Sequence, residues 1–374
     1  MTLAIDSIPT AGADELTALA AHLQAEPAHQ VVILTLTATG DPAAVDRGFT
    51  AALRGALESA VEPDPANLRH VWGDWPHDLF AALEPHTAAI AGRAVALFAW
   101  PDGRCDALAT EVEMRPVCYY LVQPVSFPIL EAAAALRPVA AVELHRQHAV
   151  IRQFQGARES ASVVIHAEGR DPRQKTGSNA LEHAERHDQK VEASYFAKVA
   201  GEVEGMSPTA RAVVVIGTDE SRRRFLPHLS WVPAVGGVEL NPDPERAAPA
   251  DAILAAAERA IGAQQSSALA AAEETARATS DWQVIARAAR DGQLHEVWMD
   301  PGAALHSYIC NHCGSLTEGM DDCRACQTSA WERLPLPEYV LREATRTGAR
   351  VHFAIESAAA ALGRGTGAVG VLRY

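Results

Sequence analysis

Apolar and polar positions along the first third of the chain predict a mixture of strands and helices. An apolar, β-branched run at 29–37 ends in the turn sequence ATGDP and predicts a strand. Residues 43–61 then show helical spacing, and the pattern stops at EPDP. A second strand with a turn signal is expected at 93–103, followed by a strand and loop at 117–130. Residues 1–139 are therefore expected to form a mixed α/β domain.

The middle of the chain has a strand, an exposed loop and a long helix in succession. Residues 139–156 predict two strands joined by a polar turn, and SVVIH predicts a third. A polar, basic loop follows, and after it a long helix. Residues 211–229 then predict a strand, a turn and the start of a basic helix. We assign 140–245 to a middle α/β domain. The buried stripe of the long helix is expected at Leu181, Ala184, Val191, Tyr195 and Val199.

The last third of the chain alternates helices with strands. The proline-rich segment 241–251 marks a linker, and an alanine-rich helix is expected at 250–279. Helix, turn and strand signals occupy 283–300, another helix and strand occupy 337–355, and a short helix, glycine turn and strand end the chain. This alternation indicates a three-layer α/β domain at 246–374. The whole chain is thus expected to be α/β, with three domains.

Composition and charge narrow the class of protein. The 374 residues are 48% hydrophobic and 21% charged, which is typical of a soluble globular protein. The N-terminus has no basic region followed by an apolar core, and the longest apolar runs fall short of the ~20 residues that a membrane span needs. No Walker loop, dinucleotide fingerprint or nucleophile elbow occurs. We expect a cytoplasmic, monomeric protein that does not contact a membrane.

Four of the six cysteines lie within one short segment. Their spacing, C-x2-C-x9-C-x2-C, places two pairs of thiolates on two tight turns, as in zinc ribbons. Four cysteine ligands leave no open coordination position, so a structural Zn²⁺ is expected, inserted between a strand and a helix of the third domain. Metal-free thiols or a redox pair remain the alternatives, and His312 is an alternative ligand. The four cysteines are Cys310, Cys313, Cys323 and Cys326.

Two histidines on the long helix have the spacing of a second metal site. His183 and His187 are spaced i, i+4, and His166 precedes them by one loop. Glutamates and an arginine alternate with this pair, so an exposed helix face is the favoured interpretation.

The order of elements in the last two thirds resembles a known family. The segment VIARAARDGQLHEVWMD, the cysteine insertion, LREATRTGARVHFAI and the ending GRGTGAVGVLRY are similar to the third domain of archaeo-eukaryotic class-1 peptide-chain release factors and Pelota-like proteins. A glycine turn followed by LRY is common among bacterial members. The strand, loop and long helix resemble the second domain, and RRRFLPHL resembles the family segment after the next strand. The resemblance covers 140–374; before that it rests on element type alone.

One departure from the family pattern bears on chemistry. Members that release peptides carry Gly-Gly-Gln in the loop before the long helix, and this chain has EGRDPRQKTGSNALEHAERH there instead. Gln174 is the single glutamine of that loop. Between Arg173 and Lys175 its amide could orient a water beside an ester while the cations hold RNA phosphate. The alternative is an exposed basic loop with an incidental glutamine.

A net charge of −15 makes local basic clusters the decisive feature for RNA binding. A cluster is more often a solvated surface than a site, so each is a hypothesis. RNA-binding residues are expected at Arg170, Arg173, Lys175, Arg222, Arg223 and Arg224. A partner-binding face is expected on the penultimate helix, where i, i+4 and i+8 spacing joins Arg342, Arg346 and Arg350.

The resemblance implies a factor that acts in the ribosomal A site. Without Gly-Gly-Gln, the favoured function is binding of idle or stalled ribosomes, in hibernation or rescue, without catalysis. Gln174 keeps a second function open, hydrolysis of the peptidyl-tRNA ester. A stress-linked scaffold that never meets the ribosome is the third. The implied partners are rRNA, P-site tRNA and a translational GTPase.

Overall fold

In a computed structural model the chain is a mixed α/β protein, as its sequence predicts. Its internal contacts divide it into two compact units, one made of residues 1–136 and 268–374 and the other of 137–267. Among the described helices, none is long and apolar enough to cross a membrane. The residues described are 5, 8–25, 31–37, 81–100, 102–112, 114, 117–121, 125–167, 178–229, 234–238, 248–300, 303, 306–310, 312, 316–317, 323, 325–328, 331–354, 358–359, 362 and 367–374.

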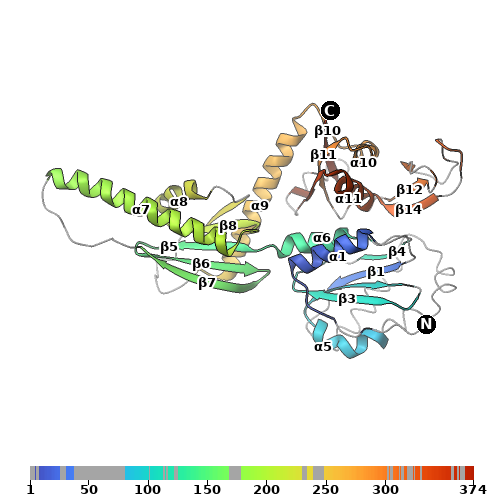
Figure 1. The fold of residues 1–374 in the computed structure, drawn as a ribbon, viewed down its shortest axis with the longest axis horizontal. Coiled ribbons are helices and arrows are strands. Elements are labelled where there is room, and N and C mark those ends of the chain that lie inside the picture. The colour runs from blue at the N-terminus through green and yellow to red at the C-terminus, as the bar shows by residue number, and fades with distance from the viewer. Residues whose placement is uncertain are drawn as a thin grey trace. The chain divides into compact units, whose positions relative to one another are not determined.

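The N-terminal part of the first unit is a four-stranded antiparallel sheet with two helices on one face (Figure 1). Ala94, Ala96 and Phe98 alternate along one strand and therefore face the helices together. Leu16 and Phe127 on the two helices are buried in the same cluster. The sheet order is β3-β2-β1-β4. The elements are α1 (Ala13–Ala25), β1 (Val31–Thr37), η1 (Glu84–His86), α5 (Thr87–Ile90), β2 (Ala94–Ala99), β3 (Cys105–Thr110), β4 (Val117–Leu121) and α6 (Phe127–Leu136).

The C-terminal part of the first unit has three layers around a second four-stranded sheet. Val297 and Met299 face one pair of helices, whereas Trp298 between them packs against Leu269 on the opposite face. The sheet order is β10-β16-β11-β15. The elements are α9 (Ala250–Glu273), β10 (Ala278–Thr279), α10 (Trp282–Arg290), β11 (Leu294–Met299), α11 (Leu336–Thr347), β15 (Arg350–Phe353) and β16 (Ala368–Leu372).

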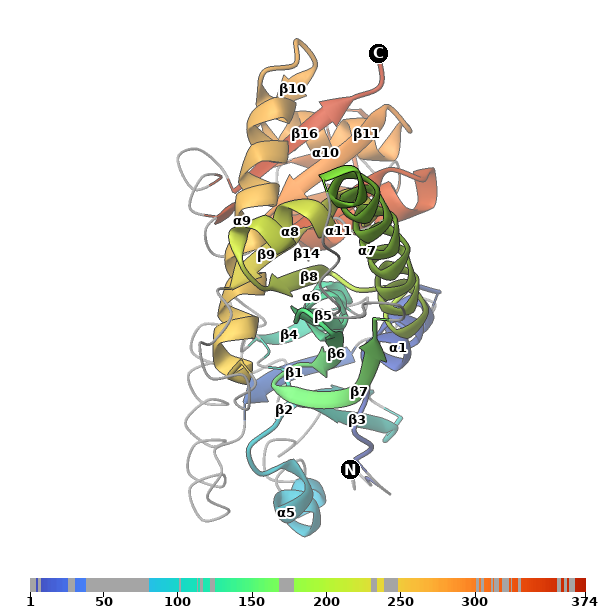
Figure 2. The same ribbon diagram turned by 90° about the vertical axis from the view of Figure 1, so that its left-hand side faces the viewer.

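The second unit is a five-stranded sheet in the order β7-β6-β5-β8-β9. Its long helix α7 (Ser178–Met206) buries Tyr195 and Val199 on one face of the sheet. The first part of α9 packs on the other face, where a Cβ added to Gly236 would lie 2.9 Å from the Ala256 carbonyl oxygen (Figure 2). The remaining elements are β5 (Val139–Leu144), β6 (His148–Gln155), β7 (Arg158–His166), β8 (Ala212–Ile216), α8 (Asp219–Phe225), η2 (Leu226–His228) and β9 (Val235–Val238).

Several elements differ from the sequence-based expectations. A helix, α6, begins at Phe127, within the segment expected to be a loop. Pro128, the second residue of α6, is compatible with the start of a helix. The apolar residues before it continue the pattern of the preceding strand, so the sequence did not show where the helix begins. The expected helix at 250–279 ends at Glu273, and α1 and β3 had not been assigned. The helix expected at 43–61 lies outside the described residues.

A buried carboxylate joins the two parts of the first unit. Glu338 in the first turn of α11 has no exposed surface. It accepts hydrogen bonds from the backbone N–H groups of Ser126 and Phe127, at 2.9 and 3.0 Å, and from the Ser126 hydroxyl at 3.0 Å. Arg342 pairs with it at 2.8 Å. Glu338 thus caps the N-terminus of α6 from a segment more than two hundred residues away in sequence.

Candidate functional site

The cysteine segment folds as a small sheet of its own between β11 and α11. Its central strand pairs antiparallel with both neighbours, and Cys310 ends that strand. Cys323 and Cys326 lie on a tight turn, in which the N–H of Gln327 donates to the Cys323 carbonyl at 2.6 Å. The strands are β12 (His306–Cys310), β13 (Leu316–Thr317) and β14 (Trp331–Pro335). The sequence predicted the position of the insertion but not these strands.

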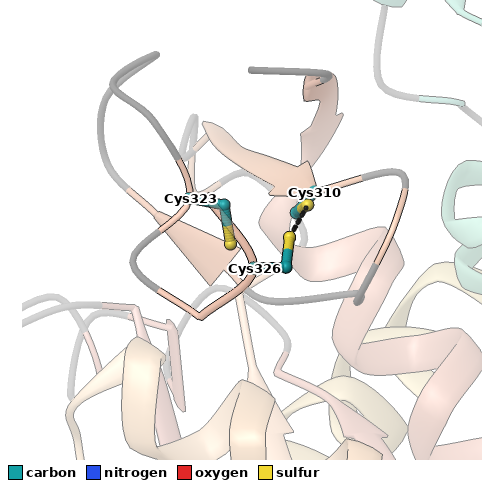
Figure 3. Close-up of side chains that lie close together, drawn as sticks. All are labelled: Cys310, Cys323 and Cys326. Carbon is teal, nitrogen blue, oxygen red and sulfur yellow. Dashed lines mark hydrogen bonds between the residues drawn. The ribbon is translucent and has the colours of Figure 1, made fainter. Parts of the chain in front are cut away.

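Three cysteine side chains converge in this segment (Figure 3). The sulfur atoms of Cys310, Cys323 and Cys326 all lie within 4.8 Å of one another, and those of Cys310 and Cys326 are 3.4 Å apart. Zn–S bonds of ~2.3 Å in a tetrahedron place sulfurs about 3.8 Å apart, so the cluster fits such an ion closely. The Thr328 hydroxyl also contacts Cys310 and Cys326, each at 3.2 Å.

Cys313 and His312 are the other ligands that the sequence offers for this metal site. Cys313, the fourth predicted ligand, lies outside the described residues. His312 is exposed and is not part of the cluster. The three clustered cysteines form no disulfide, and Cys310 and Cys323 are each 1% exposed. A buried set of thiol ligands without an accessible open position can clamp a loop but is poorly suited to bind a substrate.

The predicted RNA-binding loop lies between β7 and α7. Arg170, Arg173, Gln174 and Lys175 are outside the described residues, so their roles remain predictions. The helix that follows has 29 residues and is therefore ~43 Å long. Its described side chains are fully buried only from Tyr195 onward. Figure 1 shows the first turns of α7 extending beyond the strands of its sheet. The part of the second unit described here therefore packs against the C-terminal portion of α7.

The second predicted RNA-binding cluster lies on α8 and is largely neutralised. Arg222 pairs with Asp219, one turn before it on the same helix. Arg224 pairs with Glu192 of α7 at 2.7 Å and with Glu220 at 2.8 Å. Arg223 is exposed. Paired arginines offer less charge to phosphate, so α8 is a weaker candidate than the sequence indicated.

The prediction of a partner-binding face on the penultimate helix is wrong, because α11 ends before Arg350. The helix stops at Thr347, where Gly348 adopts a left-handed conformation (φ 70°), so Arg350 lies on β15 and not on the helix. The three arginines therefore do not share a helical face. Arg342 is 15% exposed and pairs with Glu338, whereas Arg346 and Arg350 are 60% and 62% exposed. Arg346 and Arg350 are thus exposed, although each is also paired, with Glu343 at 2.6 Å and with Glu296 at 3.2 Å.

A histidine cluster in the second unit was not singled out from the sequence. His145, His148 and His166 are adjacent in space, with His145 and His148 stacked. The pattern His-x-x-His across a two-residue turn could have signalled that two imidazoles meet, since residues flanking such a turn are cross-strand neighbours.

Comparisons with known proteins yield structural likenesses only. No protein-family model and no curated protein matches the sequence. An archaeal translation termination factor, aRF1, is 14% identical, with 98% of this chain and 99% of that chain covered and a TM-score of 0.27. Thermoplasma acidophilum Pelota is 12% identical, with 100% and 99% covered and a TM-score of 0.28. Saccharomyces cerevisiae Dom34 is 9% identical, with 98% and 94% covered and a TM-score of 0.41. The chain is similar to these proteins along its length, and we draw no function from likenesses this distant.

Proposed function

We propose that the protein is a ribosome-associated factor that binds the A site of idle or stalled ribosomes, in hibernation or rescue. The observation that carries the proposal is the long helix α7, whose described side chains are buried from Tyr195 onward and which follows the basic segment 170–175 in sequence. A tip of this kind can enter a deep, phosphate-lined pocket while the folded sheet stays outside.

The charge of the chain fits this mode of binding better than free RNA binding. A protein with a net charge of −15 is repelled by RNA at long range, so its affinity must come from a short basic segment. The loop between β7 and α7 contributes Arg170, Arg173 and Lys175 within six residues. We infer that these cations position the loop on phosphates without reading sequence.

The cysteine cluster supports a structural role for a metal. We propose that Cys310, Cys313, Cys323 and Cys326 hold one Zn²⁺, which fixes the insertion between β11 and α11. The burial of Cys310 and Cys323 and the close approach of three sulfurs support this assignment. When bound, the ion supplies a cross-link between the two turns and no reaction chemistry.

A partner protein is proposed for the C-terminal part of the first unit. Dom34 is described as a translation termination-like factor that interacts with Hbs1, and archaeal Pelota has been placed on the ribosome with ABCE1. We propose that this chain recruits a translational GTPase through a surface that includes Arg346 and Arg350, whose side chains are 60% and 62% exposed.

Co-sedimentation with ribosomes from growing and starved cells tests the proposed function. The protein is expected to pellet with ribosomes, more strongly with those from starved cells, and to leave peptidyl-tRNA intact. Cleavage by the wild type that Gln174→Ala abolishes, with sedimentation unchanged, would favour the hydrolase. Absence from both ribosome pellets would favour the scaffold.

A further inference from the structure

Three histidines form a row across three strands at one end of the five-stranded sheet. His145 follows β5, His148 begins β6 and His166 ends β7. The N–H of His145 donates to the His148 carbonyl at 2.9 Å, and His148 is the cross-strand partner of His166. The ring centroids of His145 and His148 are 4.4 Å apart, and those of His148 and His166 are 6.1 Å apart. We call His145, His148 and His166 the histidine row.

The histidine row lies on the face of the sheet opposite α7. Ala149 and Ile165, the chain neighbours of His148 and His166, are buried in the core beneath α7. Since successive side chains of a strand point to opposite faces, His148 and His166 point away from that core. Val164, on the same face as His166, is 50% exposed, and His166 is itself exposed. The outer part of the row is therefore open to solvent.

The charged groups around the histidine row balance one another. Glu143 lies 3.7 Å from His145, and its carboxylate is also 3.4 Å from Arg152 and accepts from the Ala248 N–H at 3.1 Å. Arg152 pairs as well with Glu159 at 2.8 Å. Arg146, in the turn between His145 and His148, is exposed. Glu143 and Glu159 both pair with Arg152, and each proton taken up by the row adds one positive charge to this group.

We propose that the histidine row is a proton-dependent contact site for RNA phosphate. Protonated imidazoles donate hydrogen bonds from both nitrogens and suit phosphate oxygens. The row adjoins the basic loop in sequence, because the loop begins directly after His166 and Ala167. The choice of RNA as ligand rests on the proposed ribosomal function.

Protonation of the histidine row would make RNA binding depend on pH. Burial, followed by the neighbouring imidazoles His145 and His166, lowers the pKa of His148, so this ring is neutral near pH 7 in the free protein. A phosphate beside the row would favour the charged form and raise that pKa. Binding is therefore accompanied by proton uptake and strengthens as the pH falls.

The geometry of the histidine row suits a metal ion less well than it suits phosphate. The His145 and His148 rings stack face to face at an interplanar angle of 17°, so their nitrogen lone pairs do not converge on one point. Among the described residues, the cysteine cluster is the one group of three or more potential metal ligands whose ligand atoms all lie within 4.8 Å of one another.

Binding of a fluorescent RNA duplex, measured by anisotropy at about pH 7.5 and about pH 6.0 and constant ionic strength, tests the proposal. If one proton is taken up per complex, the wild-type Kd is expected to fall by up to about 30-fold across this range. The variant His148→Gln/His166→Gln should bind like the wild type at the higher pH and lose most of the pH dependence. The control His22→Gln/His295→Gln, in the other unit, should keep it.

Equal pH dependence in the wild type and in the His148→Gln/His166→Gln variant would overturn the proposal. So would the absence of RNA binding at either pH. A third contradicting outcome is pH-dependent affinity for a glutamate-rich peptide without affinity for RNA. The last would assign the row to an acidic protein partner. As a measurement that needs no variant, NMR titration of the wild-type imidazoles should show the pKa of His148 rising when the duplex is added; an unchanged pKa would contradict the proposal. Since the probe is free RNA, pH-dependent binding together with absence from ribosome pellets would reject the ribosomal function but retain the row.

Discussion

At the scale of single residues, Glu338 shows how a polar group in the core can hold two parts of a chain together. Burial raises the pKa of Glu338, while Arg342 and the donors of Ser126 lower it. The carboxylate satisfies two N–H groups at the start of α6, which would otherwise be buried without partners. Leu341 on the same helix packs in the N-terminal core beside α6.

Replacing Glu338 is therefore expected to destabilise the first unit. Glu338→Ala removes an acceptor of three hydrogen bonds and leaves Arg342 partly buried without its carboxylate, at a cost of about 3 kcal/mol in the free energy of unfolding. Chemical denaturation measures the loss. The control Glu343→Ala breaks a pair with the exposed Arg346 and should cost less than about 1 kcal/mol. Equal effects of the two substitutions would contradict the role given to Glu338.

His352 gives the first unit a pH-dependent stability. Its ring stacks on Trp298 with centroids 4.1 Å apart, and burial lowers its pKa despite Glu296 nearby. The unfolded chain therefore binds this proton at a higher pH than the folded chain does. Stability is expected to fall as the pH drops below about 6.5, and the loss should continue down to the folded pKa. Urea unfolding at about pH 7.5 and about pH 5.5 should show a smaller difference for His352→Gln than for the wild type or His295→Gln.

At the scale of elements, helices and strands with regular patterns were predicted well. The apolar residues of β5, β6, β8, α7 and β16 recur with the spacing expected of a strand or a helix, so the positions of these elements could be predicted. The short strands of the cysteine insertion were missed because their order depends on contacts between distant cysteines and not on local pattern. The continuation of α11 to Arg350 was wrong because Gly348 ends the helix, a signal present in the sequence but not used.

The cysteine insertion is expected to depend on one zinc ion. Elemental analysis of protein purified without chelator should find about one zinc per chain. Cys323→Ser should abolish the zinc and accelerate hydrogen exchange at 306–335, while β11 and β16 stay protected because their buried cluster is built mainly from α10 and α11. Cys105→Ser on β3 is the matched control. If no zinc is found and all four thiols of the segment can be titrated, the proposal of a zinc site is wrong.

At the scale of the whole molecule, an acidic chain is proposed to bind an acidic partner through one projecting loop. The long helix α7 could be predicted from the sequence, but the order of the strands and the pairing of Arg224 with Glu192 could not. The pair of Arg224 with Glu192 joins α8 to α7, and the sequence alone does not show that these two charges meet, whereas the i, i+3 pair of Arg222 with Asp219 lies within α8. The division into three domains remains a prediction.

Neutralising the loop should weaken ribosome binding and its response to salt. If each cation neutralises one phosphate, Arg170→Gln/Arg173→Gln/Lys175→Gln should lower the salt dependence of the binding constant by up to about three counterion units. The matched control Arg222→Gln/Arg223→Gln/Arg224→Gln should have a smaller effect, because two of its arginines are paired within the protein. Equal, negligible effects of both triple variants would mean that these clusters are only solvated surface.

Site-specific cross-linking tests the central claim most directly. A photoreactive residue placed at Gln174 should cross-link to large-subunit rRNA at the peptidyl-transferase centre in ribosomes that have bound the protein. The same group placed at Glu204, an exposed position near the opposite end of α7, should not reach that rRNA. Cross-links from position 174 to this rRNA are the predicted result. Their absence from ribosome-bound protein, or equal cross-linking from both positions, would contradict binding in the A site through this loop.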